Sequence, residues 1–156
     1  ERITRVNSFL AADIRQTGNF VSLFFLEIEA KSRAIRWVRA GHDPALLFDP
    51  FTERFDELKG QGLVLGVEED YSYEQHERII EESGTIICIG TDGIWETQNS
   101  AGQMFGKHRL REIICTNSDK SAHAIQNAVL EAVGNFRMEA PQDDDITIVV
   151  IKAMPI

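Results

Sequence analysis

Hydrophobic residues at helical spacing open the chain. Apolar side chains recur every three or four positions from Ile3 to Ile14, which predicts an amphipathic helix of about three to four turns. The next apolar runs are short and rich in β-branched and aromatic residues, as is typical of strands. We expect these strands over residues 21–28, 33–40, 45–48, 51–58 and 71–80, the first two paired as a hairpin. In the strand over 71–80, Tyr71, Tyr73 and Ile79 are expected on one face.

The most continuous apolar strand candidate lies in the second half of the chain. Residues 85–89 read Thr-Ile-Ile-Cys-Ile, which is typical of a strand buried on both faces. A short helix is expected around 105–114, and a longer amphipathic helix over 121–137, where apolar residues follow helical spacing. A closing strand is expected over 146–151. This order of elements predicts an α+β fold with mostly antiparallel pairing.

Composition narrows the class of protein. The 156 residues suit a single domain, and 16 Lys+Arg against 25 Asp+Glu give a net charge of −9, which argues against nucleic-acid binding. No apolar run approaches the ~20 residues of a membrane-spanning helix. Cys88 and Cys115 suit a reducing compartment, so we expect a cytoplasmic location. Neither cysteine has an Arg six residues later, which excludes a cysteine-dependent phosphatase.

Acidic residues stand at the ends of two predicted strands. Asp92 follows the buried strand, and the run Asp143, Asp144 and Asp145 precedes the closing strand. If these strands are antiparallel neighbours, the carboxylates converge and would take up protons or a cation. Oxygen ligands favour Mg²⁺ or Mn²⁺ over zinc. A plainer interpretation stays open, because Asp-Gly is a common turn dipeptide and acidic loops are usually solvated.

The spacing Asp143-x-Asp145-x-Thr147 also matches the DxDxT motif of haloacid-dehalogenase-type phosphatases, whose first Asp is a nucleophile. That motif follows a buried strand, whereas this run precedes its strand. We therefore exclude a phosphoaspartate mechanism.

Several short motifs occur in one order along the chain, and together they resemble a known family. They are FVSL (20–23), AGHDPALL (40–47), GLVLG (62–66), TDGIWE (91–96), FG (105–106) and DDIT (144–147). The set resembles the bacterial branch of the metal-dependent PP2C-like serine/threonine protein phosphatases, of the SpoIIE and RsbU type. The resemblance implies a sandwich of two antiparallel sheets flanked by helices, with a two-metal site between the edges of the sheets.

The same resemblance implies the site and the chemistry. Asp92 and Asp144 would be metal ligands, and Asp145 a less direct neighbour. Two Mg²⁺ or Mn²⁺ ions would activate a water that hydrolyses phosphoserine or phosphothreonine, with no catalytic side chain as nucleophile. The implied substrate is a signalling protein of the anti-anti-sigma-factor type. An upstream sensor or receiver domain would control the activity in signal transduction or a stress response.

One expected motif has no counterpart in the chain. The family carries a GD-x-SGHG-like segment upstream of the opening helix, with the Asp that bridges both metals. We therefore expect residues 1–156 to be a single phosphatase domain that is N-terminally truncated, and weak or inactive alone. A non-catalytic binding or regulatory module on the same fold is the main alternative. A more remote one is an unrelated α+β domain whose motifs are coincidental.

Overall fold

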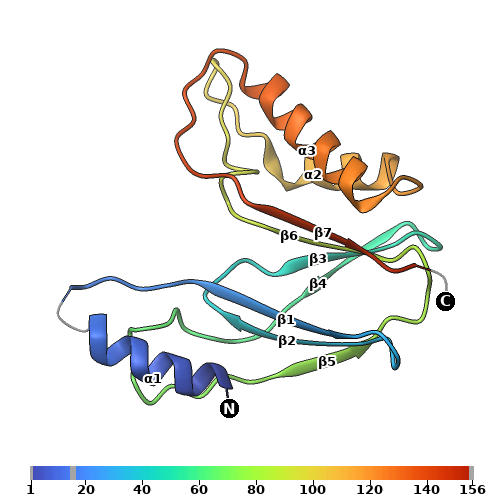
Figure 1. Ribbon diagram of the computed structural model, residues 1–156. Coiled ribbons are helices and arrows are strands. Elements are labelled where there is room, and N and C mark those ends of the chain that lie inside the picture. Colours follow the sequence, from blue (N-terminus) through green and yellow to red (C-terminus); the bar gives the residue numbers. More distant parts are fainter. Residues whose placement is uncertain (1, 15–16, 155–156) are drawn as a thin grey trace. The chain divides into compact units, whose positions relative to one another are not determined.

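The computed structural model describes residues 2–14 and 17–154 of the chain. The chain divides into two compact units. We call Glu1–Pro44 with Leu58–Glu81 the first unit, and Ala45–Glu57 with Glu82–Ile156 the second unit. Helices and antiparallel sheets confirm the α+β class predicted from the sequence (Figure 1). None of the described helices is long and apolar enough to cross a membrane.

The first unit contains one helix and a three-stranded antiparallel sheet in the order β1-β2-β5. Its elements are α1 (Arg2–Ile14), β1 (Leu23–Glu29), β2 (Ala34–Ala40) and β5 (His76–Ile79). β1 and β2 form the hairpin that the sequence predicts, in a register that pairs Leu23 with Ala40. One buried cluster of this unit consists of Ile3, Val38, Ala40, Leu65 and Tyr73.

The buried face of α1 includes one polar residue, Asn7. Ile3, Asn7 and Ala11 are buried, one helical turn apart, whereas Val6 and Phe9 are 50% and 66% exposed. The apolar pattern therefore predicts the helix and most of the side that packs, because Ile3 is buried and Leu10 packs against the same cluster. The Asn7 amide adds hydrogen bonds to the segment 66–69.

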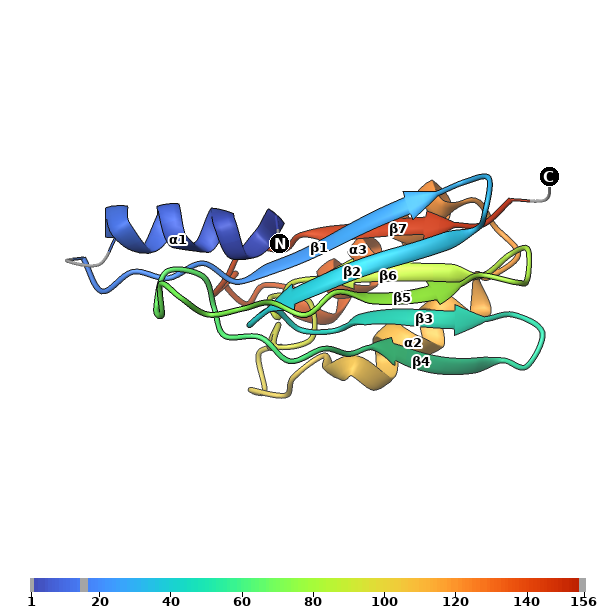
Figure 2. The same ribbon diagram turned by 90° about the horizontal axis from the view of Figure 1, so that it is seen from below.

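The second unit contains two helices on one face of a four-stranded sheet in the order β4-β3-β6-β7 (Figures 1 and 2). Its elements are β3 (Ala45–Asp49), β4 (Arg54–Leu58), β6 (Ile86–Gly90), α2 (Gly106–Thr116), α3 (Ala122–Arg137) and β7 (Ile148–Lys152). The buried core is built by both helices and the strands beneath them. It consists of Leu46, Phe48, Ile86, Cys88, Ile94, Phe105, Leu110, Ile114, Ile125, Val129, Val133 and Ile148.

The strand expected over 71–80 is shorter than predicted. Only His76–Ile79 pairs with β2, and Ile79 is 58% exposed, so the expected face of Tyr71, Tyr73 and Ile79 is wrong. Tyr73 is buried, but its backbone N–H donates a hydrogen bond to the Thr4 hydroxyl of α1 at 3.3 Å. This segment therefore packs against the helix instead of extending the sheet.

Three other strands begin later than expected, the closing one at Ile148 instead of residue 146. Val21 exchanges backbone hydrogen bonds with Leu65 as an isolated bridge, so β1 begins at Leu23. Phe51 lies in a turn before β4, where the Asp49 carboxylate accepts its N–H at 2.8 Å. The strand predicted over 85–89 is confirmed, because successive residues Ile86, Ile87 and Cys88 are all buried.

Candidate functional site

The end of β6 lies beside the start of β7. The two strands pair antiparallel, with Gly90 opposite Ile148. This pairing confirms the condition on which the convergence of the acidic residues depended. The contact continues past the strands, because the Thr91 N–H donates to the Thr147 carbonyl at 3.1 Å and the Thr147 N–H donates to the Thr91 hydroxyl at 2.9 Å.

The TDG and DDIT segments touch directly at Asp145. The Thr91 hydroxyl donates to the Asp145 carbonyl at 3.1 Å. A Cβ at Gly93 would overlap that same carbonyl oxygen, so only glycine allows the two segments to come this close. The structure therefore brings together the backbones that carry Asp92, Asp144 and Asp145.

The three predicted ligands are all exposed to solvent. The Asp92 Oδ1 accepts the N–H of Gly93 at 3.1 Å, and the Asp144 Oδ1 accepts the N–H of Asp145 at 2.7 Å. Each bond joins the carboxylate to the N–H of the next residue and holds it close to its own backbone. The roles of Asp92, Asp144 and Asp145 as metal ligands stay a prediction.

The oxygen atoms of this region are of the kind that a hard cation binds, but there are too few of them among the described residues to hold one alone. Carboxylate and carbonyl oxygens are the ligands that Mg²⁺ and Mn²⁺ prefer. Across residues 2–14 and 17–154, however, no group of three or more His, Cys, Asp or Glu side chains could hold a metal ion. The described residues therefore fit part of a metal site, to which further ligands would have to be added.

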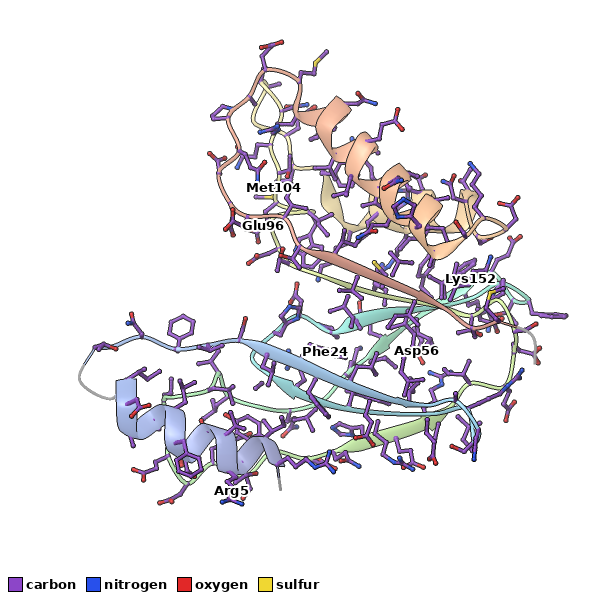
Figure 3. The ribbon with its side chains drawn as sticks, viewed as in Figure 1. Arg5, Phe24, Asp56, Glu96, Met104 and Lys152 are labelled. Atoms are coloured by element: carbon purple, nitrogen blue, oxygen red, sulfur yellow. The ribbon has the colours of Figure 1, made fainter. Side chains whose placement is uncertain are left out.

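A small pocket of about 130 Å³ adjoins the acidic run. One wall is the loop from β6 to α2, on which Glu96 and Met104 lie (Figure 3). The other wall runs from the end of α3 to the acidic run. The lining residues are Gly93, Glu96, Thr97, Gln98, Met104, Arg137, Pro141, Gln142, Asp143 and Asp144.

The loop from β6 to α2 is held in a defined shape by backbone hydrogen bonds. The N–H of Phe105 donates to the carbonyl of Thr97, and that of Gly106 to Trp95, both at 2.8 Å. Gln98 and Met104 form an isolated antiparallel bridge. This wall of the pocket is therefore built from main-chain contacts.

Sequence reasoning missed Arg137, which lines this pocket at the end of α3. A signal was available, since Arg137 is the sole Lys or Arg between Lys120 and Lys152 and is six residues from Asp143. Met104 offered no such signal, because its place in the pocket depends on the bridge to Gln98.

Cysteine chemistry is excluded on the strand that leads to Asp92. Burial raises the pKa of the Cys88 thiol to about 12, so the group is protonated at neutral pH. A buried, neutral thiol is a poor nucleophile. Its place is in the core of the second unit.

Comparisons with known proteins agree with this geometry. The profile of the family described as Stage II sporulation protein E (SpoIIE) matches residues 1–154. The chain is 24% identical over 136 residues to phosphoserine phosphatase RsbU of Bacillus subtilis (strain 168), covering 85% of the chain and 39% of RsbU. It therefore spans less than half the length of that relative.

Solved structures share the fold. The PP2C phosphatase domain of the cell fate determinant SpoIIE from Bacillus subtilis, solved with a fragment of its regulatory domain, superposes with a TM-score of 0.76 at 16% identity, covering 97% of this chain and 43% of that chain. The SiaA-PP2C domain of Pseudomonas aeruginosa superposes with a TM-score of 0.66 at 24% identity, covering 78% of this chain and 47% of that chain. At such identities the likeness establishes the PP2C-like fold.

Proposed function

The chain belongs to the SpoIIE family, and on that premise we propose that it forms part of a PP2C-type protein phosphatase that hydrolyses phosphoserine or phosphothreonine on a signalling protein. The observation that carries the proposal is the direct contact of the TDG and DDIT segments at Asp145. Motifs more than fifty residues apart in the sequence meet at one sheet edge, where a phosphatase of this family would need its carboxylates.

In this proposal the chain supplies ligands and their positions. Asp92 and Asp144 would hold one cation, and Asp145 would lie beside them as a less direct neighbour. The hydrogen bonds of Thr91 to Thr147 and Asp145 hold the two segments in place. When bound, two Mg²⁺ or Mn²⁺ ions supply an activated water and screen the phosphoryl charge. Hydrolysis would place an oxygen from water on phosphorus, break the phosphorus–oxygen bond to the substrate residue, and return a proton to the released hydroxyl.

The proposal extends to the whole protein. We propose that both units work as one phosphatase domain, and that a further carboxylate, which residues 2–14 and 17–154 do not supply, would complete the metal site. The substrate would be a phosphorylated protein of the anti-anti-sigma-factor type, under the control of a sensor or receiver domain. A cytoplasmic location is part of the proposal, supported by two cysteines that are free thiols.

The test uses the full-length protein with a phosphoserine peptide and either Mn²⁺ or Mg²⁺. Asp92→Asn and Asp144→Asn are each expected to lower turnover by about 100-fold or more, since even the outer partners of metal ligands cost about 10–100-fold. Asp119→Asn, an exposed acid between α2 and α3, is the matched control and should leave turnover unchanged. Equal activity of all three variants would contradict the proposed site.

The second candidate is a non-catalytic binding module on the same fold. The observation that favours it is the exposure of Asp92 and Asp144, each of which accepts the N–H of the next residue. The two candidates separate in one experiment. Tight binding of a phosphoprotein by a full-length protein that stays inactive in both metals would establish the binding module.

A further inference from the structure

Arg137 is the sole cationic side chain lining the pocket beside Asp144. It is the last residue of α3 and is partly buried. Three acidic residues line the same pocket: Glu96, Asp143 and Asp144. The pocket therefore places one positive charge among negative charges, next to the carboxylates that the proposed function assigns to a metal.

The guanidinium of Arg137 is left without a partner. Among residues 2–14 and 17–154 it makes no hydrogen bond, ion pair or aromatic contact, although acidic residues line the same pocket. Neighbouring arginines in the second unit are engaged. Arg109 donates to the Phe105 carbonyl at 2.6 Å, and Arg111 donates to the Glu57 carboxylate at 2.9 Å. Arg137 therefore differs from them in having all five N–H donors available.

An available guanidinium in a pocket suits an incoming oxyanion. Its planar donors match the two oxygens of a carboxylate or phosphoryl group, and such charge-assisted bonds are among the strongest in proteins. A partly buried position strengthens them further, because the local dielectric is lower than in water. Because the chain has a net charge of −9, an unpaired cationic side chain in this pocket is a stronger indication of an anion site than it would be on a basic surface.

The pocket that Arg137 lines also contains an exposed apolar side chain, Met104. Met138, the next residue, has φ of 53° and ψ of −119°, a backbone conformation that is strained for a non-glycine residue. It ends α3 with Arg137 at the rim of the pocket. Met104 lines the opposite wall and is 56% exposed, and methionine adapts to varied apolar partners.

We propose that Arg137 is a specificity-determining residue that binds an oxyanion of the phosphoprotein substrate in this pocket, with Met104 as the apolar wall. The inference rests on the proposed phosphatase function. Two sources of the oxyanion share this chemistry: the phosphoryl group itself, and an acidic side chain of the substrate next to the phosphoserine.

The test compares Arg137→Ala and Arg137→Glu in the full-length protein with Mn²⁺. Arg54→Ala and Arg54→Glu are the matched controls, because Arg54 is an exposed arginine of the same unit that also has no partner among the described residues. The substrates are p-nitrophenyl phosphate and phosphoserine peptides in which one Glu is moved along the flanking positions, or replaced by Ala or Lys. Binding of the same peptides is measured by calorimetry with a metal chelator present.

Loss of Arg137 should raise KM for the best peptide about tenfold and leave kcat nearly unchanged, as expected when about one charge-assisted contact is lost. If a flanking acid is the partner, p-nitrophenyl phosphate is unaffected, the effect vanishes on Ala peptides, and Arg137→Glu prefers a Lys peptide. If the phosphoryl group is the partner, all substrates lose affinity equally.

The inference is overturned if both Arg137 variants behave like the Arg54 variants on every substrate while the wild-type protein turns over. If the wild-type protein shows no turnover, the proposed function fails, and binding without metal decides the inference separately. Weaker binding in Arg137→Glu than in Arg54→Glu would then support it, and equal or undetectable binding would refute it.

Discussion

The two units attach a helix to a sheet with the same spacing but different chemistry. In the second unit, α3 buries Ile125, Val129 and Val133 at positions i, i+4 and i+8. In the first unit, α1 buries residues 3, 7 and 11 at the same spacing, but the middle residue is Asn7, which is completely buried. An apolar stripe and a polar anchor thus solve the same packing problem.

The amide of Asn7 has its hydrogen-bonding capacity filled. Its Nδ2 donates to the carbonyls of Glu68 and Glu69 at 2.7 and 3.2 Å. Its Oδ1 accepts the Gly66 N–H at 2.9 Å and the Tyr73 hydroxyl at 3.4 Å. A buried amide is tolerated only when it is paired in this way. The anchor therefore fixes one position of α1 by direction, whereas the stripe of α3 works through area and shape.

Placing an Asn in the apolar stripe of α3 should lower the free energy of unfolding more than removing the Asn from α1. Val129→Asn removes a buried apolar side chain and leaves an amide without partners in the core, so we expect a loss of about 3–5 kcal/mol. Urea unfolding monitored by the fluorescence of Trp95, in this unit, measures it. The adjacent Leu130→Asn, at a position 41% exposed, should cost far less. Equal losses would show that the stripe does not hold α3.

The reverse exchange, Asn7→Leu, should cost about 2–3 kcal/mol. It is apolar and of similar size, but it leaves the Gly66 N–H and the Glu68 carbonyl unpaired. Trp37 fluorescence reports on this unit. The same substitution at Asn135, an exposed position of α3, is the matched control. A stability equal to wild type would mean that area alone attaches α1.

Alkaline pH should destabilise the second unit before the first, by less than either substitution. The pKa of Cys88 is raised from 9.0 to about 12 by burial, so the unfolded state loses its proton first. The second unit should lose up to about 1.4 kcal/mol as pH rises from 9 to 10. Burial also raises the pKa of Tyr73 from 10.0, so the first unit should respond only above pH 10.

Unfolding midpoints between pH 8 and 10 measure this slope. Cys88→Ala should flatten it, while Cys115→Ala, a partly buried thiol outside β6, should leave it unchanged. A slope that persists in Cys88→Ala would place the alkaline sensitivity in another group.

The sequence predicts those elements whose burial is apolar. The strand at 85–89 and the helix at 121–137 follow from their periodicity because their buried positions are hydrophobic, and Ser121 is the N-cap of α3, accepting the Ala124 N–H at 3.2 Å. The burial of Asn7 in α1 and the end of the strand at 71–80 could not be predicted in the same way. Both depend on polar contacts, of Asn7 and Tyr73, with residues distant in the chain.

The candidate site also has a part that the sequence predicts and a part that it does not. The meeting of the Asp92 and Asp144 segments could be predicted, because it follows from antiparallel pairing of two recognisable strands. The pocket beside them could not, since it forms between two loops whose shape is set by main-chain hydrogen bonds. Arg137 and Met104 meet there through tertiary structure alone.

The spacing of the two acidic segments is set at Gly93, which has no Cβ. Its backbone already lies against the Asp145 carbonyl, so the gap is at its minimum with glycine in place. Every substitution at this position can only widen the gap, and none can narrow it. The mutational response of this position is therefore one-sided, and alanine, which adds only the Cβ, already brings the overlap with the Asp145 carbonyl oxygen.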